Sequence, residues 1–122
     1  MKEYYLISTK WTYPDSAFFT FWGANNNGYC WYKEWAGVYT EEIIKKSPDY
    51  YDSDTVKPVP KEIVDKYWED CIYDRHYVKL LPNTKKIRRL LNIKKCSLRG
   101  GMTKLCAWDV VVLKDVKQMG KR

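Results

Sequence analysis

Runs of β-forming residues, interrupted by turn residues, occupy the first third of the chain. Residues 4–9, 17–22 and 29–32 are rich in Tyr, Phe, Trp, Ile and Thr, which favour extended backbone. Residues 12–16 and 23–28 separate these runs and contain Pro, Asp, Ser, Asn and Gly, which are typical of turns. The pattern predicts three strands, the first two antiparallel, in a β-meander with many large rings.

The middle of the chain carries two helix signals. Thr40 is a typical N-cap, and acids followed by lysines over residues 41–46 complement a helix dipole. This short helix is predicted to stop at Pro48. Residues 49–58 are polar and turn-rich, which predicts a connector, and Pro60 then favours a second helical start. The apolar face predicted for this second helix consists of Ile63, Val64, Tyr67, Trp68 and Cys71.

The last third is predicted to add one helix and two strands. Ile87, Leu90 and Leu91 follow the i, i+3, i+4 spacing of a helix stripe, with basic residues on the opposite arc. Residues 78–81 form a short apolar run that suits a strand. Residues 105–113 contain an unbroken run of three valines, which predicts a central strand buried on both faces.

These elements predict one α+β domain. Its antiparallel sheet would contain roughly four to six strands and pack against two or three helices. A length of 122 residues suits a single domain. We assign residues 1–113 to this domain and residues 114–122 to a polar C-terminal tail.

The composition excludes several classes of protein. Hydrophobic residues make up 45% and charged residues 30% of the chain, as in globular rather than disordered proteins. The sequence has no apolar run long enough to span a membrane, and its first residues do not form a signal region, so we expect a cytoplasmic protein. In that reducing compartment the 4 cysteines are expected to be small buried side chains rather than disulfides.

Catalytic and metal-binding motifs are missing from the sequence. His76 is the only histidine, and the cysteines lack the close pairing typical of zinc ligands. Gly23 and Gly28 have the spacing of a P-loop, but the Lys-Ser or Lys-Thr that completes the motif does not follow. We therefore expect a protein that is not an enzyme and that uses no metal and no cofactor.

Charge is distributed unevenly along the chain. The net charge is +7, yet residues 1–54 carry −3 and residues 55–122 carry +10, with no acid between Asp74 and Asp109. Lys and Arg neutralise phosphates, so this basic stretch favours a polyanion or a phosphate-bearing ligand. The alternative is a solvated helix face, although such faces usually mix both signs. The predicted phosphate-binding residues are Lys85, Lys86, Arg88, Arg89, Lys94, Lys95 and Arg99.

Aromatic residues form a second candidate site. They make up 16% of the chain, with 6 Trp and 11 Tyr, and most lie in residues 1–51. Rings can stack on bases, and Asn amides can read base edges. The alternative is a core built from rings, which must hold for the inward half because strand residues alternate between faces. The predicted base-stacking residues are Trp22, Tyr29, Trp31 and Trp35, beside a polar loop formed by Asn25, Asn26 and Asn27.

Five short segments, in a particular order, suggest a family. They are Tyr4-Tyr5-Leu6, Thr20-Phe21-Trp22, Asn25-Asn26-Asn27-Gly28-Tyr29-Cys30, Ala36-Gly37-Val38-Tyr39 and Leu81-Pro82-Asn83-Thr84. In this order they resemble small proteins of bacteriophages and prophages that have no established activity. The resemblance covers residues 3–40 well and residues 55–93 loosely. It implies a phage setting and no catalytic residue.

Together these features lead to one hypothesis and two alternatives. Small phage proteins outside the virion often act against host systems, so we expect a counter-defence protein in the host cytoplasm. It would sequester a phosphate-bearing signalling nucleotide, with the rings stacking on the base and the cations pairing with phosphates. The first alternative is a nucleic-acid-binding protein. The second is a protein–protein inhibitor of a host nucleic-acid enzyme, which would partner a host defence protein. An exposed sheet edge would also allow pairing between copies.

Overall fold

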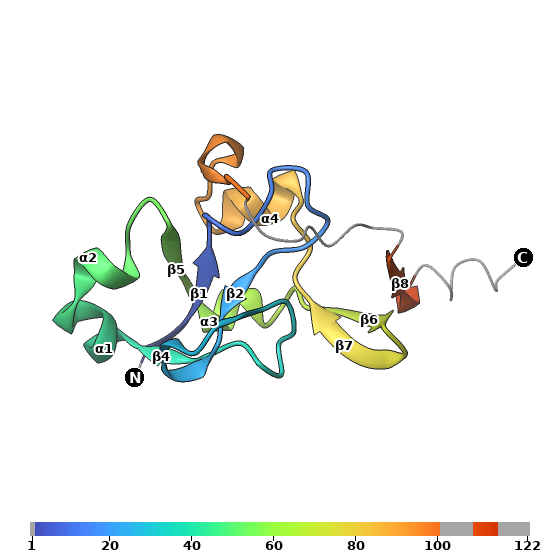
Figure 1. Ribbon diagram of the computed structural model, residues 1–122, viewed down its shortest axis with the longest axis horizontal. Helices are drawn as coiled ribbons and strands as arrows, with labels where there is room; N and C mark the ends of the chain where they lie inside the picture. The colour runs from blue at the N-terminus through green and yellow to red at the C-terminus, as the bar shows by residue number, and fades with distance from the viewer. Residues whose placement is uncertain (1, 101–108, 115–122) are drawn as a thin grey trace, which may run out of the picture.

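The computed structural model describes residues 2–100 and 109–114, which form two antiparallel sheets and four short α-helices (Figure 1). The strands are β1 (Glu3–Ser8), β2 (Phe21–Trp22), β3 (Tyr29–Cys30), β4 (Tyr39–Thr40), β5 (Val56–Pro60), β6 (Glu69–Tyr73), β7 (His76–Leu80) and β8 (Val110–Val112). The helices are α1 (Glu41–Lys46), α2 (Pro48–Tyr51), α3 (Lys61–Val64) and α4 (Lys85–Leu90), with 3-10 turns η1 (Ala24–Asn26) and η2 (Lys95–Ser97). The predicted α+β domain is confirmed, and most of the predicted tail lies outside the described residues.

Strand β1 is the centre of the larger, five-stranded sheet. One edge of β1 pairs with β5 over five residues, from Tyr4 opposite Pro60 to Ser8 opposite Val56. The other edge pairs with β4 near its start and with β2 near its end, and β3 extends β2. Strand β5 contains Pro58 and Pro60. Proline has no main-chain N–H, and it is tolerated in β5 because this strand lies at an edge of the sheet.

A second sheet of three strands has the order β7-β6-β8. Strands β6 and β7 form a hairpin whose turn residues, Asp74 and Arg75, both have positive φ, at 49° and 66°. Such a turn matches the twist of the paired strands. The inner face of this sheet buries Cys71, Val78 and Val110.

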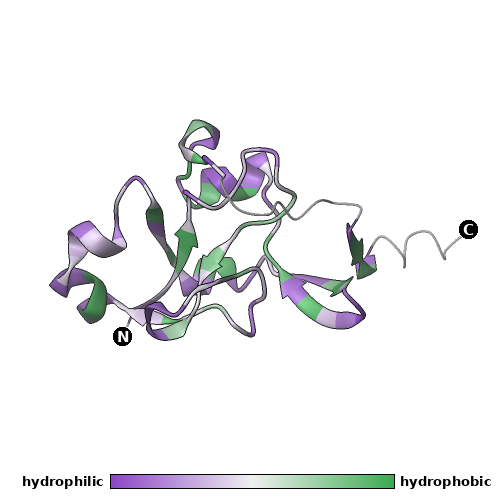
Figure 2. Ribbon diagram, in the orientation of Figure 1, coloured by the Kyte–Doolittle hydropathy of each residue, from purple (hydrophilic) through white to green (hydrophobic). Residues whose placement is uncertain are grey.

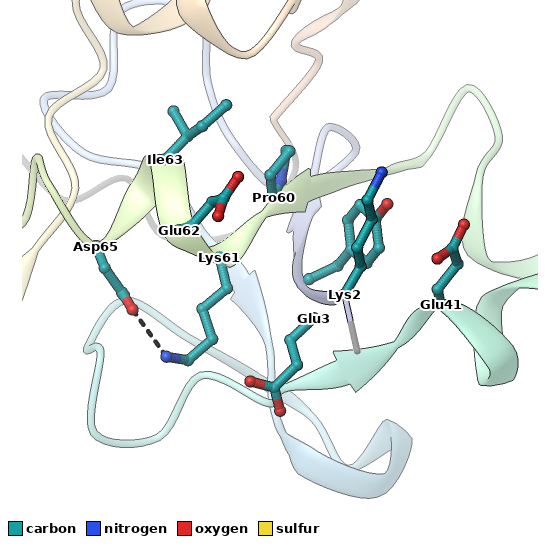
Figure 3. Close-up of a pocket in the computed structure, with 9 residues that line it drawn as sticks. Lys2, Glu3, Glu41, Pro60, Lys61, Glu62, Ile63 and Asp65 are labelled. Carbon is teal, nitrogen blue, oxygen red and sulfur yellow. Dashed lines mark hydrogen bonds and ion pairs between the residues drawn. The ribbon is translucent and has the colours of Figure 1, made fainter.

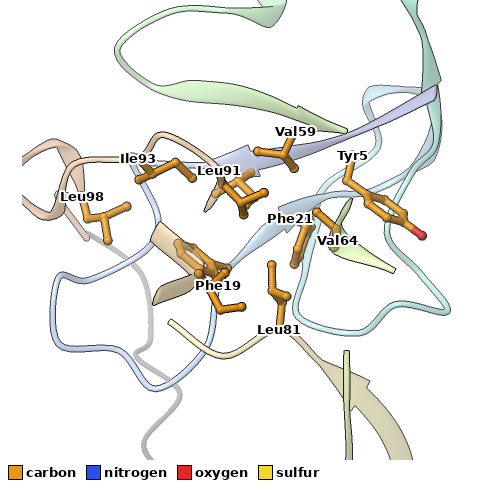
Figure 4. Close-up of a cluster of buried hydrophobic side chains, with 11 residues drawn as sticks. Tyr5, Phe19, Phe21, Val59, Val64, Leu81, Leu91, Ile93 and Leu98 are labelled. Atoms are coloured by element: carbon orange, nitrogen blue, oxygen red, sulfur yellow. The ribbon is translucent and has the colours of Figure 1, made fainter. Parts of the chain in front are cut away.

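The main hydrophobic core lies between the five-stranded sheet and helices α3 and α4 (Figure 4). Tyr5, Ile7 and Phe21 project from the sheet, and Ile87 and Leu91 project from α4 and its end. Alternate strand residues point the other way, so Leu6 and Trp22 pack with α1 and α2 in a separate cluster. The sheet therefore has two faces of different composition, and each face has its own covering elements.

The helix predicted from Pro60 to Cys71 is wrong beyond its first turn. Helix α3 ends at Val64, and β6 begins at Glu69. The side chain of Asp65 accepts hydrogen bonds from the Tyr5 hydroxyl and the Trp68 indole, which fixes a turn where the helix would continue. The apolar spacing reflects burial in two cores rather than one helix face.

Three further predictions need correction. The connector predicted over residues 49–58 holds helix α2 and most of strand β5. Within the described residues, β8 pairs only with β6 and Val111 is exposed, so this part of the predicted central strand is an edge; residues 105–108 lie outside the described ones. Cys71 is buried as expected, but Cys96 is exposed. By contrast, the helices capped by Thr40 and Thr84 are confirmed.

Candidate functional site

Helix α4 and the turn η2 present a group of lysines and arginines that we call the cationic surface. It consists of Lys85, Lys86, Arg89, Lys94 and Lys95, all of which are exposed. None of the five pairs with a carboxylate in the part of the chain that the structure describes. Neighbouring cations repel one another, so this surface is set up to attract an anion.

The local sequence explains why these cations point outward. The Thr84 hydroxyl accepts a hydrogen bond from the main-chain N–H of Ile87 at 3.2 Å and so caps α4. Ile87 and Leu91 are buried in the main core and fix which side of the helix faces the sheet. Helix α4 therefore carries both hydrophilic and hydrophobic residues (Figure 2), and Lys85, Lys86 and Arg89 face solvent.

Three of the seven predicted phosphate-binding residues already contact other groups of the protein. The Lys86 ammonium lies 5.2 Å from the centre of the Tyr67 ring and has no carboxylate partner among the described residues. The Arg88 guanidinium donates to the main-chain oxygen and the side-chain Oδ1 of Asn83, at 3.2 and 2.7 Å. Arg99 pairs with Asp54 at 3.0 Å in an exposed ion pair. Arg88 therefore supports the loop before α4, whereas Arg99 could exchange its weak surface partner for another anion.

On the other face of the sheet, four aromatic side chains form what we call the ring row. In order they are Trp11, Tyr29, Trp22 and Tyr50, with successive ring centroids 6.0, 6.4 and 5.5 Å apart. Trp22 and Tyr29 are direct partners across β2 and β3, whereas the outer two rings come from distant segments. Tyr29 is 45% exposed and Tyr50 is 54% exposed, so the row lies at the surface.

The hairpin that joins Trp22 to Tyr29 holds the polar loop in a fixed conformation. The Tyr39 hydroxyl accepts from the main-chain N–H of Asn26 at 2.9 Å and donates to the carbonyl of Gly23 at 2.6 Å. Burial raises the pKa of Tyr39, although the bond from Asn26 opposes this, so the hydroxyl keeps the proton that it donates.

The polar loop also needs a close approach from the following segment. A Cβ on Gly37 would lie 2.7 Å from the carbonyl oxygen of Gly23, so only glycine fits there. Asn25 and Asn26 have positive φ, at 57° and 59°, which Asn tolerates better than most residues. The side-chain amides of Asn25, Asn26 and Asn27 are exposed and have no hydrogen-bond partner within the described residues. The loop thus presents free amides from a rigid backbone.

The structure does not bring all four predicted stacking residues together. Trp31 donates its indole N–H to the Thr20 hydroxyl at 3.1 Å and packs in the core of the smaller sheet, against Tyr73. Trp35 is 69% exposed, but its ring neighbour is Tyr32 and not a member of the ring row. Of the predicted set, only Trp22 and Tyr29 share a surface with the Asn loop.

The cationic surface and the ring row lie on opposite faces of the five-stranded sheet. Phe21 points into the core beneath α4, and the next residue, Trp22, points to the α1–α2 side. The two surfaces approach each other at the end of β1. There the main-chain N–H of Arg99 donates to the carbonyl of Thr9 at 2.9 Å, and the Lys10 ammonium lies 4.9 Å from the centre of the Trp11 ring.

A large cavity is lined by residues that belong to neither surface (Figure 3). Its volume is about 700 Å³. Its charged lining consists of the carboxylates of Glu3, Glu41, Glu62 and Asp65 and the ammonium groups of Lys2 and Lys61. Carboxylates outnumber cations, so the cavity repels a phosphate group.

Asp65 is the best-connected carboxylate at this cavity. It accepts from the Tyr5 hydroxyl at 2.7 Å, the Trp68 indole at 2.9 Å and the Lys61 ammonium at 2.8 Å. Burial acts to raise the pKa of Asp65, but these donors outweigh it and lower the pKa. Burial, followed by the bond to Asp65, raises the pKa of Tyr5 far above its usual range. This network is fully occupied by internal bonds and therefore holds the fold together.

Comparison with protein-family models, curated proteins and solved structures finds no match. The resemblance to phage proteins therefore stays a prediction. Among the described residues, every helix is too short to cross a bilayer. The functional assignment rests on the two surfaces themselves.

Proposed function

We propose that this protein binds nucleic acid, without catalysing a reaction, through the cationic surface of α4 and η2. The observation that carries the proposal is the set of five exposed cations with no carboxylate partner in the described residues. A phosphate backbone would neutralise their mutual repulsion. Binding would also release the counterions condensed on the polymer, which supplies much of the affinity of such surfaces.

Two features favour a polymer over the enclosed signalling nucleotide of the sequestering hypothesis. The stacking rings Trp22 and Tyr29 lie on the face of the sheet opposite α4, so the rings and the α4 cations do not line one common pocket. The cavity of about 700 Å³ beside α3 is lined by more carboxylates than cations. An extended polyanion needs no enclosed pocket, because it gains its affinity from many exposed contacts.

The phage resemblance adds a setting to the proposal. In the host cytoplasm, a small protein that coats nucleic acid would shield it from host defence enzymes. This role needs no catalytic residue.

The test is a charge reversal with a matched control. Lys85→Glu/Lys86→Glu changes the net charge of the cationic surface by the same amount as Lys45→Glu/Lys46→Glu changes that of α1, where both lysines pair with glutamates. Glutamates suit the first turn of α4, where residues 85 and 86 lie, so the test variant is expected to fold. The control places glutamates at the last turn of α1, where they are less favourable.

Binding is measured by fluorescence anisotropy with labelled DNA over a series of salt concentrations. We expect the Lys85/Lys86 variant to bind about tenfold or more weakly at low salt, with a salt slope smaller by about 2. The Lys45/Lys46 control should bind nearly as the natural protein does. The proposal fails if neither single strands nor duplexes bind at low salt. It also fails if one mononucleotide or cyclic nucleotide binds tightly and independently of salt, because that result would restore the sequestering hypothesis.

A further inference from the structure

We infer that the ring row and the Asn loop hold unpaired bases, so that the nucleic acid this protein prefers is single-stranded. The inference rests on the proposed function, because it assumes that the polymer bound at the cationic surface continues past the end of β1. The bases of the bound strand would then occupy the ring row, and its phosphates would occupy the cationic surface. In a duplex the base faces are stacked on one another, so only a single strand can offer them to protein rings.

The exposed aromatic surface of the ring row belongs mainly to its two tyrosines, Tyr29 and Tyr50. Successive rings meet at 69°, 89° and 74°, so each ring turns an edge towards its neighbour. Trp22 also packs against Tyr51, and Lys10 lies over the Trp11 ring, so these two rings are half-buried between the exposed tyrosines and the fold. Bases could therefore stack on the exposed tyrosines of the row. Stacking of this kind tolerates any base, because every base has a π face.

Burial separates these rings from the ones that support the fold. Tyr39 and Tyr51 belong to the same aromatic cluster but are 4% and 8% exposed. Tyr29 and Tyr50 are each about half exposed, and Tyr50 packs against the buried Tyr51. A purely structural role would favour enclosing these large side chains, since exposed rings contribute little hydrophobic stabilisation. Their exposure suits a ligand that covers them.

The Asn loop supplies polar recognition beside the rings. An amide carries both a donor and an acceptor, which is the pattern needed to pair with the edge of a base. Because Tyr39 and Gly37 fix the backbone of the loop, binding does not have to order it first. The amides of Asn25, Asn26 and Asn27 can thus meet the edges of bases that stack on Trp22 and Tyr29.

Charge connects the ring row to the cationic surface. Lys10 lies over the Trp11 ring at one end of the row, and residue 9 accepts a hydrogen bond from Arg99. Lys94 and Lys95 come shortly before Arg99 in the same segment. A strand could therefore place phosphates along residues 94–99 and Lys10, and its next base on the exposed ring of Tyr29.

The test compares single-stranded and duplex DNA in ring variants. Tyr29→Ala/Tyr50→Ala removes two exposed rings, and Tyr77→Ala is the control because Tyr77 is 80% exposed on β7, outside the row. We expect the double variant to lose at least about fivefold in affinity for oligothymidylate, and to bind duplex DNA unchanged. Tyr77→Ala should leave both affinities unchanged. Melting temperatures show that each variant is folded.

A second measurement covers the case in which the double variant does not fold. Oligothymidylate should quench the tryptophan fluorescence of the natural protein, and Trp22→Phe should reduce that quenching. Equal affinity for single strands and duplexes, with no quenching, would overturn the inference while leaving the proposed function intact. Failure of the proposed function looks different, because then no DNA of either kind binds.

Discussion

One face of the five-stranded sheet lies under α3 and α4, and the other carries α1, α2 and the ring row. Among the described residues, eleven buried side chains form the cluster on the first face and four form the cluster on the second. The first face is closed by Ile87 and Leu91 of the α4 segment, whereas the second leaves Tyr29 and Tyr50 half exposed. The comparison indicates that stability is concentrated on one face and that the other keeps aromatic surface available for a ligand.

The same division applies to polar groups. Beneath α3, Asp65 is satisfied by three donors from the protein itself. On the opposite face, the amides of Asn25, Asn26 and Asn27 have no partner in the described part of the chain. Satisfied buried groups stabilise a fold, and free exposed groups held in a rigid loop are available for binding.

The largest expected effect is on the free energy of unfolding, when one ring on each face is replaced by alanine in a separate variant. Phe21→Ala removes a fully buried side chain from the main core and should lower the free energy of unfolding by about 3–5 kcal/mol. Tyr50→Ala removes a half-exposed ring that packs against Trp22 and Tyr51, and should cost less than about 3 kcal/mol, the upper range of two aromatic pairs. Urea unfolding of the two variants measures both. Equal losses of unfolding free energy would show that both faces contribute equally to stability, and would contradict the division between them.

A smaller effect is expected at Asp65. Asp65→Asn should lower the free energy of unfolding at neutral pH by about 2 kcal/mol, because it weakens charge-assisted hydrogen bonds. The folded protein lowers the pKa of Asp65, so its contribution is present above the unfolded pKa and is lost as the pH falls through the folded pKa. The natural protein should therefore lose stability on acidification over that range, and the variant should lose less. The account of this network is wrong if both proteins respond to acid in the same way.

Local signals in the sequence were sufficient for the capped helices and for the class of fold. Thr40 marks a helix start that the structure keeps, because a capping hydroxyl acts within three residues. The helix of residues 85–90 was predicted from its apolar spacing, and the structure adds Thr84 as its cap. The helix predicted from Pro60 was too long, because the apolar residues after Pro60 pack into two different cores. The turn at Asp74 and Arg75 joins β6 to β7, but its positive φ values are visible only in the structure, because Asp-Arg is not a typical hairpin pair in a sequence.

The cationic surface was predictable from the spacing of basic and apolar residues along α4, whereas the ring row was predictable only where its residues lie in one hairpin. Trp22, Tyr29 and the loop between them follow each other closely, so sequence grouped them correctly. Trp11 and Tyr50 were missed, because their place in the ring row depends on long-range packing. The division into faces was foreseeable at one point, since strand neighbours such as Phe21 and Trp22 must point in opposite directions.

The most direct test of the two-surface account is amide chemical-shift mapping by NMR during titration with oligothymidylate. The account predicts shifts in α4 and η2, at residues 9–11 and in the hairpin from Trp22 to Tyr29, on both faces of the sheet. The amides of Lys2, Glu62 and the rest of the acidic cavity should stay unchanged. Shifts confined to that cavity, or no shifts at saturating oligonucleotide, would contradict it.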